Sequence, residues 1–470
     1  MKLKEITVKD QFTPALAVTG RVDTWLKDPT RRYPVSCTVM SIDDTMDESE
    51  DSIEQSFLFA SKALRYGAGV SLHLSKLRPR GTENKHGMVA SGPCGFMEIY
   101  SKFNEILRRG GQYRNGAIVC QLDWDHSDII EFINYDRARI PWAKRCVNVD
   151  PDVINKPDVL NAIMEGARKG DIWIVKKQYD AQGDRLFHNV CQEILIKSRD
   201  TCLLSHINLA GTKDVSEIPS AFVHGMEFLC TLYQKTGVDK AGIYSRKDNQ
   251  VGLGVLGLAN LLAIEGVTYK QLTDALRNRN LGIRPEVITM ADAIAIALDV
   301  GYEEAAKVAK RHRMSRAFTI APTASCAYRY KDRKGFTTTP EISPPISLEV
   351  DRDSSTLGVQ TYKFNPKCET AVDVGWETFF ELNCEWQKMM DRTGLAHAIS
   401  MNWWSDLTKF DRQFMSRWLN SPLKSLYYSL QVQPGTQDKS DVYAALDEVD
   451  VDDYLNDILT EQAPNCDCAE

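Results

Sequence analysis

Strand-like and helical segments alternate along most of this 470-residue chain. Residues 53–69 carry apolar side chains at helical spacing and end on glycine, and residues 69–77 then alternate like a strand. Such alternation predicts an α/β architecture with a substantially parallel sheet, because parallel strands need crossover connections that helices usually supply. The chain is long enough to enclose a large core.

Four more segments have helical patterns. Residues 251–267 are nearly all apolar, which predicts an interior helix. Residues 291–312 predict one or two helices, and residues 377–394 and 410–421 predict outer helices of a C-terminal region. The sequence has no internal repeat and no low-complexity tract.

The composition argues against several classes of protein. A net charge of −7 disfavours non-specific binding to nucleic acid or to an anionic membrane, and no apolar run approaches the length of a membrane span. The first ten residues lack the apolar core of a signal peptide, so we expect a cytoplasmic protein. Its 12 cysteines then predict transient disulfides at most, and without CxxC or zinc spacing we predict no metal site.

The stretch 188–194, HNVCQEI, places three polar side chains at alternate positions in apolar surroundings. On a strand, Asn189, Cys191 and Glu193 would line one face. A thiol beside a carboxylate and an amide suits redox or radical chemistry, because the carboxylate takes a proton and the amide orients a hydroxyl. The alternative is a small buried cysteine with two hydrogen-bonded neighbours.

Other stretches carry residues suited to ligands. Cys37 and Cys202 lie in strand-like segments, and the glycines at 110–111 favour either close approach to a ligand or a tight surface turn. Small and hydroxyl residues at 322–326 would cradle a phosphate at a strand-to-helix junction, although the P-loop motif is absent. The adjacent tyrosines at 427–428 are either aromatic core or a stacked pair.

Eight stretches in order resemble the large catalytic subunit of ribonucleotide reductase: PVSC, RYGAGVSLHLSKLRPRG, GGQYRNGA, NVCQEI, DTCLLSHINLAG, APTASCAY, LYY and NCDC. The asparagine–x–cysteine–x–glutamate triplet is the most specific of them. The resemblance implies a ten-stranded α/β barrel of two five-stranded parallel halves joined antiparallel. A finger loop rises through its centre, so Cys191 is expected in a loop rather than in the middle of a strand.

The resemblance assigns a role to each residue of the central set. Cys191 matches the cysteine that becomes a thiyl radical and takes the 3′ hydrogen of the ribose. Glu193 matches the general base at the 3′ hydroxyl, and Asn189 matches the residue that hydrogen-bonds the ribose hydroxyls. Cys37 and Cys202 match the redox pair that supplies two electrons and closes to a disulfide as the 2′ hydroxyl leaves as water.

The resemblance also implies four groups of binding and redox residues outside the central set. They are a diphosphate cradle, an effector site, a loop that reads the substrate base and a pair of tail thiols. The cradle is Ser36, Pro322, Thr323, Ala324, Ser325 and Cys326; the effector site is Asp44, Arg78 and Lys85; the specificity loop is Gly110, Gly111, Gln112 and Arg114; the tail thiols are Cys466 and Cys468.

The pair Tyr427 and Tyr428 resembles the tyrosines through which class I enzymes receive the radical from a separate ferritin-like small subunit with a dimetal site. We therefore expect such a partner and no covalently bound cofactor. The alternative is a class II enzyme, which generates the radical from adenosylcobalamin. A non-catalytic nucleotide-binding relative and an unrelated α/β enzyme are further alternatives.

The same resemblance implies that the enzyme reduces ribonucleoside diphosphates, draws electrons from thioredoxin or glutaredoxin, binds a dNTP or ATP effector and forms a homodimer. The expected organisation has three parts. Residues 1–30 are a short N-terminal segment without an ATP-cone, 31–435 are the barrel with peripheral helices, and 436–470 are a flexible acidic tail with the redox cysteines.

Overall fold

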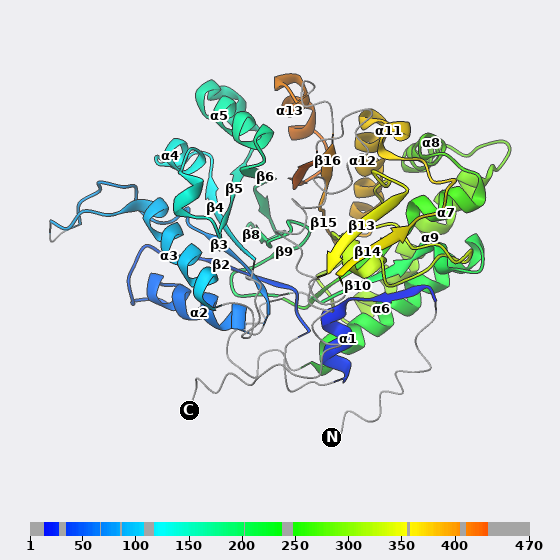
Figure 1. The fold of residues 1–470 in the computed structure, drawn as a ribbon, viewed down its shortest axis with the longest axis horizontal. Helices are drawn as coiled ribbons and strands as arrows, with labels where there is room; N and C mark the ends of the chain where they lie inside the picture. Colours follow the sequence, from blue (N-terminus) through cyan, green and yellow to red (C-terminus); the bar gives the residue numbers. More distant parts are fainter. Residues whose placement is uncertain are drawn as a thin grey trace.

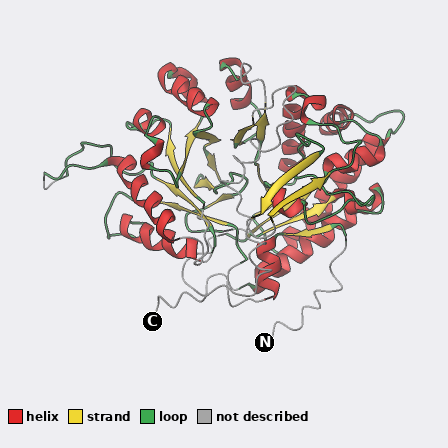
Figure 2. Ribbon diagram, in the orientation of Figure 1, coloured by secondary structure: helices red, strands yellow, loops and turns green. Residues whose placement is uncertain are grey.

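The computed structural model describes residues 14–27, 34–65, 67–84, 87–107, 117–201, 203–236, 248–354, 358–404 and 410–430, with the backbone alone at 352–354, 358–359, 402–404 and 428–430. Within these residues two sheets face each other, and helices cover their outer sides (Figures 1 and 2). In the part of the chain described, no helix combines the length and the apolar character that a membrane crossing needs.

The first sheet contains five parallel strands in sequence order, as expected for strands joined by crossover helices. The helices between the strands lie on the outer side of this sheet (Figure 1). The strands are β2 (Cys37–Ser41), β3 (Gly69–His73), β4 (Ile118–Asp123), β5 (Lys144–Val149) and β6 (Ile172–Lys176); the helices are α2 (Ile53–Arg65), α3 (Gly92–Leu107), α4 (Ile129–Ile133) and α5 (Pro157–Arg168).

The second sheet contains four parallel strands and one antiparallel edge strand. Longer helices pack on its outer side and on one another. The parallel strands are β10 (Leu204–Asn208), β11 (Gln250–Leu256), β12 (Arg316–Ile320) and β15 (Ala396–Ile399), and β1 (Leu16–Val18) lies antiparallel to β10; the helices are α1 (Gly20–Lys27), α6 (Ile218–Lys235), α7 (Leu258–Glu265), α8 (Tyr269–Asn280), α9 (Met290–Arg311) and α12 (Trp376–Arg392).

Contacts along two seams join the halves antiparallel. At one seam, β17 (Ser425–Leu426) pairs antiparallel with β6, and the Ser425 hydroxyl donates to the carbonyl of Ile399, which ends β15. At the other seam, an antiparallel bridge links Thr38 on β2 to Thr201, just before β10. The α/β fold of two mainly parallel halves joined antiparallel, predicted from the sequence, is therefore confirmed. The prediction of five parallel strands in each half is wrong for the second half, because its fifth strand, β1, pairs antiparallel with β10.

The remaining elements lie between the halves and around their rims. A three-stranded antiparallel group stands in the central space between the sheets (Figure 1). It comprises β7 (Gln178–Tyr179), β8 (Arg185–His188) and β9 (Leu195–Ile196); the rim elements are β13 (Glu349–Ser354), β14 (Gly358–Lys363), β16 (Asn402–Trp404), β18 (Tyr428–Leu430), α10 (Ala324–Ala327), α11 (Ala371–Val374) and α13 (Arg412–Leu419), with 3₁₀ turns at Arg137–Arg139, Pro151–Asn155, Leu209–Gly211 and Val215–Glu217.

Aromatic contacts fix the helices of the second half onto its sheet. The Tyr302 ring on α9 lies 4.7 Å from the Phe222 ring on α6 and 5.0 Å from the Phe318 ring on β12, measured between centroids. The Tyr302 hydroxyl accepts a hydrogen bond of 2.9 Å from the indole N–H of Trp386 on α12. The Tyr302 hydroxyl and the Trp386 N–H are therefore hydrogen-bonded to each other, while the rings exclude water. Buried tyrosine and tryptophan usually stabilise a core in this way.

Most of the predicted elements are present, and one was predicted wrongly. The helices expected at 53–69, 291–312, 377–394 and 410–421 correspond to α2, α9, α12 and α13, and residues 291–312 form one helix. The apolar run 251–267 is not a single helix, because its first part is strand β11 and only the second part is α7. A fully buried strand and a buried helix are both uniformly apolar, so periodicity cannot separate them.

Two glycines in the barrel wall make room for the central loop. A Cβ atom on Gly69 of β3 would lie 3.0 Å from Val190 Cγ2, and one on Gly252 of β11 would lie 3.0 Å from Ile194 Cδ1 and 2.5 Å from Leu204 Cδ2. Contacts this short are rare for real Cβ atoms, so a side chain at either position would displace the loop. The glycines therefore set how closely residues 189–194 approach both walls.

We expect Gly252→Ala to lower the free energy of unfolding by about 1–3 kcal/mol, because a methyl group there overpacks the interior. Thermal or urea unfolding of the purified variant measures this change. Gly95→Ala on α3 is the matched control, since its Cβ would meet only the Ser91 side chain and alanine favours a helix. Equal stability of the two variants would contradict the close packing of the loop.

Candidate active site

The stretch HNVCQEI forms the tip of the central loop. Strands β8 and β9 pair through Phe187 with Ile196 and His188 with Leu195, and the chain turns between them. The turn is closed by the N–H of Asn189, which donates to the carbonyl of Ile194 at 3.2 Å, and by the N–H of Ile194, which donates to Asn189 Oδ1 at 3.1 Å. Cys191 therefore lies in a loop, as the family resemblance predicted, and not within a strand.

Three buried side chains meet at this tip. The thiols of Cys37 on β2 and Cys191 lie within hydrogen-bonding reach of each other, and the hydroxyl of Tyr427 reaches Cys191 as well. All three are at most 7% exposed. The Tyr427 ring packs 4.7 Å from the ring of Trp173 on β6. A thiol thus sits between a second thiol and a phenol in a site shielded from water.

The two thiols differ in acidity. A hydrogen bond from the Cys191 thiol lowers the pKa of Cys37 to about 7, helped by the Arg21 charge, the Asn189 amide and the backbone N–H of Val190. The same hydrogen bond raises the pKa of Cys191 well above its ordinary value, and burial and the Glu193 carboxylate act in the same direction. Cys37 is therefore the acidic thiol of the pair, and Cys191 keeps its proton.

We expect the rate of Cys37 alkylation to rise with a midpoint near pH 7, because only the thiolate reacts. The Cys191→Ala variant removes the largest stabiliser of that thiolate, so its midpoint should move to higher pH. Iodoacetamide labelling followed by peptide mass spectrometry measures both. Cys384 serves as an internal control, since burial raises the pKa of this thiol to about 12. A wild-type midpoint near pH 9 would refute this geometry.

Asn189 and Glu193 hold the tip of the loop in place. Both are 1% exposed. The side-chain amide of Asn189 also reaches the Cys37 thiol and favours its thiolate form. The carbonyl of Glu193 accepts from Thr319 Oγ1 and from the N–H of Ala398, both at 2.9 Å, which ties the tip to the second half.

The run 322–326 follows β12 and continues into α10, at the strand-to-helix junction that the sequence predicted. Thr323 is buried, its N–H donates to Glu341 Oε1 at 2.6 Å, and its hydroxyl accepts from the N–H of Glu341 at 2.8 Å. Ser36 lies beside Cys37 and Asn189 at a narrow gap that is too small to hold a water molecule. Of the remaining members of the predicted cradle, Pro322, Ala324 and Ser325 are half-buried. Cys326 is buried, and its thiol donates a hydrogen bond to the carbonyl of Val18.

The predicted effector residues lie beyond the carboxyl ends of β2 and β3. The guanidinium of Arg78 forms an ion pair of 2.6 Å with Asp44, and Lys76 pairs with the neighbouring Asp43 at 2.7 Å. Both pairs are partly open to solvent, where such pairs contribute at most about 1 kcal/mol to stability. The ion pair therefore brings together Asp44 and Arg78, two of the three predicted effector residues.

Several predicted site residues lie outside the described residues, so their positions stay predictions. For Tyr428 only the backbone in β18 is described. The others are Lys85, Gly110, Gly111, Gln112, Arg114, Cys202, Cys466 and Cys468, together with the acidic tail 436–470.

Three residues of the site were not predicted from the sequence. Arg21, on α1, is buried and donates to the carbonyl of Val35. Trp173 packs on Tyr427, and Cys146 on β5 lies in the same buried cluster as Cys37 and Cys191. None of the three residues belongs to a motif. For Cys146 and Trp173 the available signal was the strand pattern, which points every second residue of β5 and β6 into the barrel. Arg21 lies on a helix and had no such signal.

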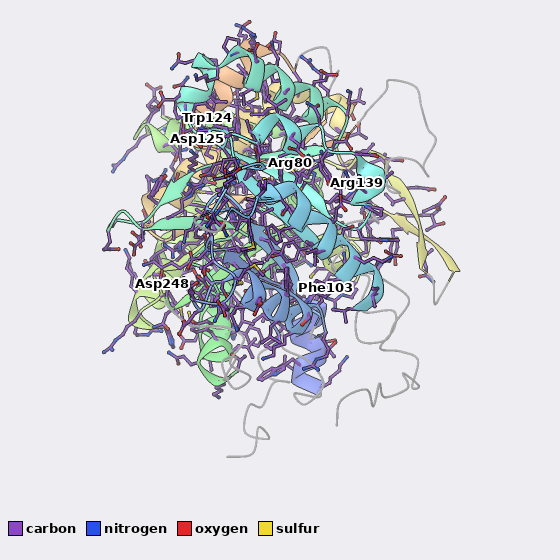
Figure 3. All side chains as sticks on the ribbon, turned by 90° about the vertical axis from the view of Figure 1, so that its left-hand side faces the viewer. Arg80, Phe103, Trp124, Asp125, Arg139 and Asp248 are labelled. Carbon is purple, nitrogen blue, oxygen red and sulfur yellow. The ribbon has the colours of Figure 1, made fainter. Side chains whose placement is uncertain are left out.

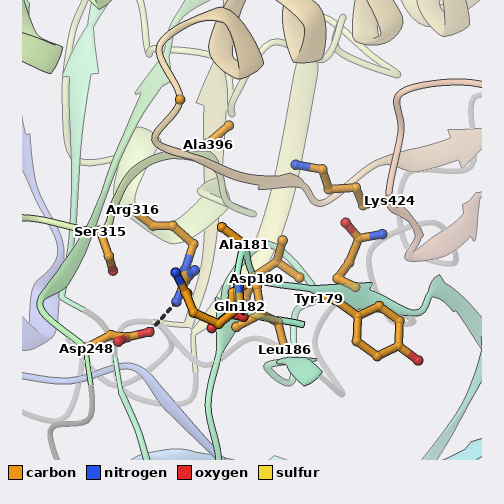
Figure 4. A pocket seen from close by; sticks show the side chains of 13 residues that line it. Tyr179, Asp180, Ala181, Gln182, Leu186, Asp248, Ser315, Arg316, Ala396 and Lys424 are labelled. Carbon is orange, nitrogen blue, oxygen red and sulfur yellow. Dashed lines mark hydrogen bonds and ion pairs between the residues drawn. The ribbon is translucent and has the colours of Figure 1, made fainter. Parts of the chain in front are cut away.

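A separate polar pocket of about 360 Å³ lies where the strands of the second half begin (Figure 4). Arg316, at the start of β12, forms a 2.8 Å ion pair with Asp248 in its wall, and Lys424 enters from another side. None of the sequence-predicted site residues lines this pocket. The predicted phosphate cradle follows the other end of β12, so the two lie at opposite ends of that strand.

Charged residues also gather at the carboxyl end of β4 on the first half. Trp124 and Asp125 lie together there (Figure 3), and Lys177 packs over the Trp124 ring while pairing with Asp125 at 3.0 Å. Arg80 pairs with Glu131 of α4 at 2.9 Å. Each of these charged side chains has a partner of opposite charge. We therefore interpret this cluster as solvated surface rather than as a binding site.

Sequence comparison links the chain to one family. A family model described as "Ribonucleotide reductase, barrel domain" matches residues 35–179 and 176–301, which is more than half of the chain. The chain is 25% identical over 275 residues to a vitamin B12-dependent ribonucleoside-diphosphate reductase from Mycobacterium tuberculosis, covering 50% of this chain and 39% of that protein. A protein of the same description from Thermoplasma acidophilum is 25% identical over 278 residues, covering 50% and 35%. The match therefore spans about two fifths of the length of these relatives.

Structural comparison gives a different relative. The fold resembles the Actinobacillus ureae class Id ribonucleotide reductase alpha subunit with a TM-score of 0.67 over 89% of this chain and 87% of that one, at 16% identity. At this identity the likeness concerns the fold alone, and it supports the barrel assignment made from the sheets.

Proposed function

The chain belongs to the ribonucleotide reductase family through its barrel domain, and from this premise we propose that it is a catalytic subunit that reduces ribonucleotides to 2′-deoxyribonucleotides. The observation that carries this proposal is the contact of Cys191 with both Cys37 and Tyr427 in one buried cluster. Cleavage of a carbon–hydrogen bond by a sulfur radical requires such a shielded thiol with a relay beside it.

The first half of the proposed reaction uses Tyr427, Cys191 and Glu193. A Tyr427 phenoxyl radical takes the hydrogen atom of the Cys191 thiol, and the resulting thiyl radical takes the 3′ hydrogen of the ribose. Glu193 accepts the proton of the 3′ hydroxyl. The raised pKa of Cys191 favours this order, because the residue must hold its hydrogen until the tyrosine radical arrives.

The second half uses the redox thiols. Cys37 donates its proton to the leaving 2′ hydroxyl, which departs as water, and its lowered pKa makes it a better acid than an ordinary thiol. Cys37 and Cys202 then supply two electrons and one further hydrogen as they close to a disulfide, and Glu193 returns its proton to the 3′ oxygen. Cys191 returns its hydrogen atom to C3′ and recovers the radical, so each turnover consumes two thiols and releases one water.

We place the radical source in a separate ferritin-like metal subunit, because a buried hydroxyl in contact with Cys191 serves as the last member of a relay from outside the chain. Tyr428 is the preceding member in this proposal. Thioredoxin or glutaredoxin restores the thiols through Cys466 and Cys468. Ribonucleoside diphosphates are the proposed substrates, a dNTP or ATP the proposed effector, and a homodimer in the cytoplasm the proposed working form.

An adenosylcobalamin-dependent reductase is the second candidate, since the curated relatives with matching sequence are vitamin B12-dependent. In that case Tyr427 would not transfer a radical from a partner subunit to Cys191. Assay of the purified chain separates the candidates: deoxyribonucleotide formation only with a class I small subunit supports the first, and formation with adenosylcobalamin alone supports the second. No product under either condition would overturn the proposed function.

A further inference from the structure

Gln192, between Cys191 and Glu193, carries two unfavourable features at once. Its φ of +68° lies in the left-handed region, which costs a non-glycine residue of order 1 kcal/mol. Its side chain is fully buried, and the amide oxygen has no hydrogen-bond partner among the described residues. A turn that needed only the backbone angle would be served better by glycine, which adopts it without strain.

Specific contacts keep Gln192 in this conformation. Its N–H donates to the carbonyl of Asn189 at 3.2 Å, and its carbonyl accepts from Nδ1 of His188 at 2.9 Å. Its side-chain amide donates to the sulfur of Cys146 on β5 at 3.4 Å. The last contact crosses from the loop to the barrel wall, so the wall fixes the side chain as well as the backbone.

The wall holds the base of the loop in the same way. Gln121 on β4 donates to the carbonyl of His188 at 3.0 Å and to the hydroxyl of Ser71 at 2.6 Å. The loop is therefore anchored on β3, β4 and β5 rather than resting on apolar packing alone. Gln192 is the member of this network closest in sequence to the reactive groups.

The conformation of residue 192 decides how its two neighbours face each other. In an extended chain, residues 191 and 193 would point to the same side. A left-handed residue between them turns the chain, so the directions of the Cys191 thiol and the Glu193 carboxylate depend on the angle held at 192. A displacement of about 1 Å between reacting groups costs up to about 100-fold in rate.

We propose that Gln192, anchored on Cys146, is a positioning residue that sets the relative orientation of Cys191 and Glu193. Cys146 acts here as a hydrogen-bond acceptor in the wall and not as a redox thiol. This inference rests on the proposed function for its kinetic consequences but not for its structural ones.

Four variants test the proposal. Gln192→Gly removes the anchor and relieves the backbone strain, so it should keep or raise thermal stability while kcat falls about 10- to 100-fold at unchanged KM. Cys146→Ala should lower kcat by a similar factor, and Cys146→Ser should restore most of it, because a hydroxyl accepts the same hydrogen bond. Cys120→Ala, a buried cysteine on the adjacent strand β4 that packs in the outer core instead, is the matched control and should leave kcat unchanged.

A second measurement does not depend on catalysis. The pH midpoint of Cys37 alkylation, held near 7 by the Cys191 thiol, should rise in Gln192→Gly and in Cys146→Ala and return in Cys146→Ser. If the wild-type chain makes no deoxyribonucleotide, the proposed function fails while this shift still supports the positioning role. Wild-type kcat or an unchanged midpoint in Gln192→Gly would overturn the inference.

Discussion

Replacement of Cys191 by serine is expected to reduce turnover by more than about 10³-fold, to the background of the assay. A serine O–H bond is too strong for a tyrosine phenoxyl radical to break, so no radical reaches the substrate. The side chain is nearly isosteric and buried, so the fold and nucleotide binding should stay within about twofold of the wild type. Product formation and equilibrium binding of a ribonucleoside diphosphate measure the two properties separately.

The control for this variant is a second buried cysteine. Cys384→Ser lies on α12, outside the cluster of Cys37, Cys191 and Tyr427, and should keep its activity. Activity of Cys191→Ser above one tenth of the wild type would show that the thiol carries no radical. Loss of nucleotide binding in the same variant would mean that Cys191 shapes the pocket instead.

Replacement of Tyr427 by phenylalanine is the second large effect. When the radical comes from a partner subunit, this variant should lose more than about 10³-fold in kcat, because phenylalanine has no phenolic hydrogen to give up. Packing should change little, since the ring keeps its contact with Trp173 at 4.7 Å. Steady-state assays with the partner subunit, compared with adenosylcobalamin alone, measure the effect.

Tyr100→Phe on α3 is the matched control, as a buried tyrosine whose hydroxyl contacts Ser56 away from the central loop. It should cost about 1 kcal/mol in the free energy of unfolding and leave kcat unchanged. Full activity of Tyr427→Phe with adenosylcobalamin would favour the class II alternative. Full activity with a metal subunit would exclude Tyr427 from the radical path.

The sequence pattern alone predicted the α/β class but not how the strands close into a barrel. Apolar patterning predicted β3 correctly because polar Ser71 and His73 alternate with apolar Val70 and Leu72, and it predicted α2 because its apolar residues recur at helical spacing. It failed at 251–267, where β11 has only apolar residues and glycines after Gln250, so its pattern resembles that of a buried helix. The break between β11 and α7 is Gly257, with φ of +79°, a local signal that the apolar run concealed.

The candidate site was predictable only through the family resemblance. Alternation in HNVCQEI placed Asn189, Cys191 and Glu193 on one strand face, whereas the chain turns there through the left-handed Gln192. A glycine would have signalled that turn, and glutamine does not. Contacts of Cys191 with Cys37 and Tyr427 join residues far apart in the sequence, and no periodicity carries that information.

The most direct test of the radical at Cys191 uses a ribonucleotide carrying deuterium at C3′, measured in a single turnover of the reduced protein with its radical source. The hydrogen at that carbon should move to the Cys191 sulfur and back, so the deuterated substrate should react more slowly and its label should stay at C3′ of the product. Product that forms at the same rate from both substrates, with the label lost to solvent, would contradict a thiyl radical at this position.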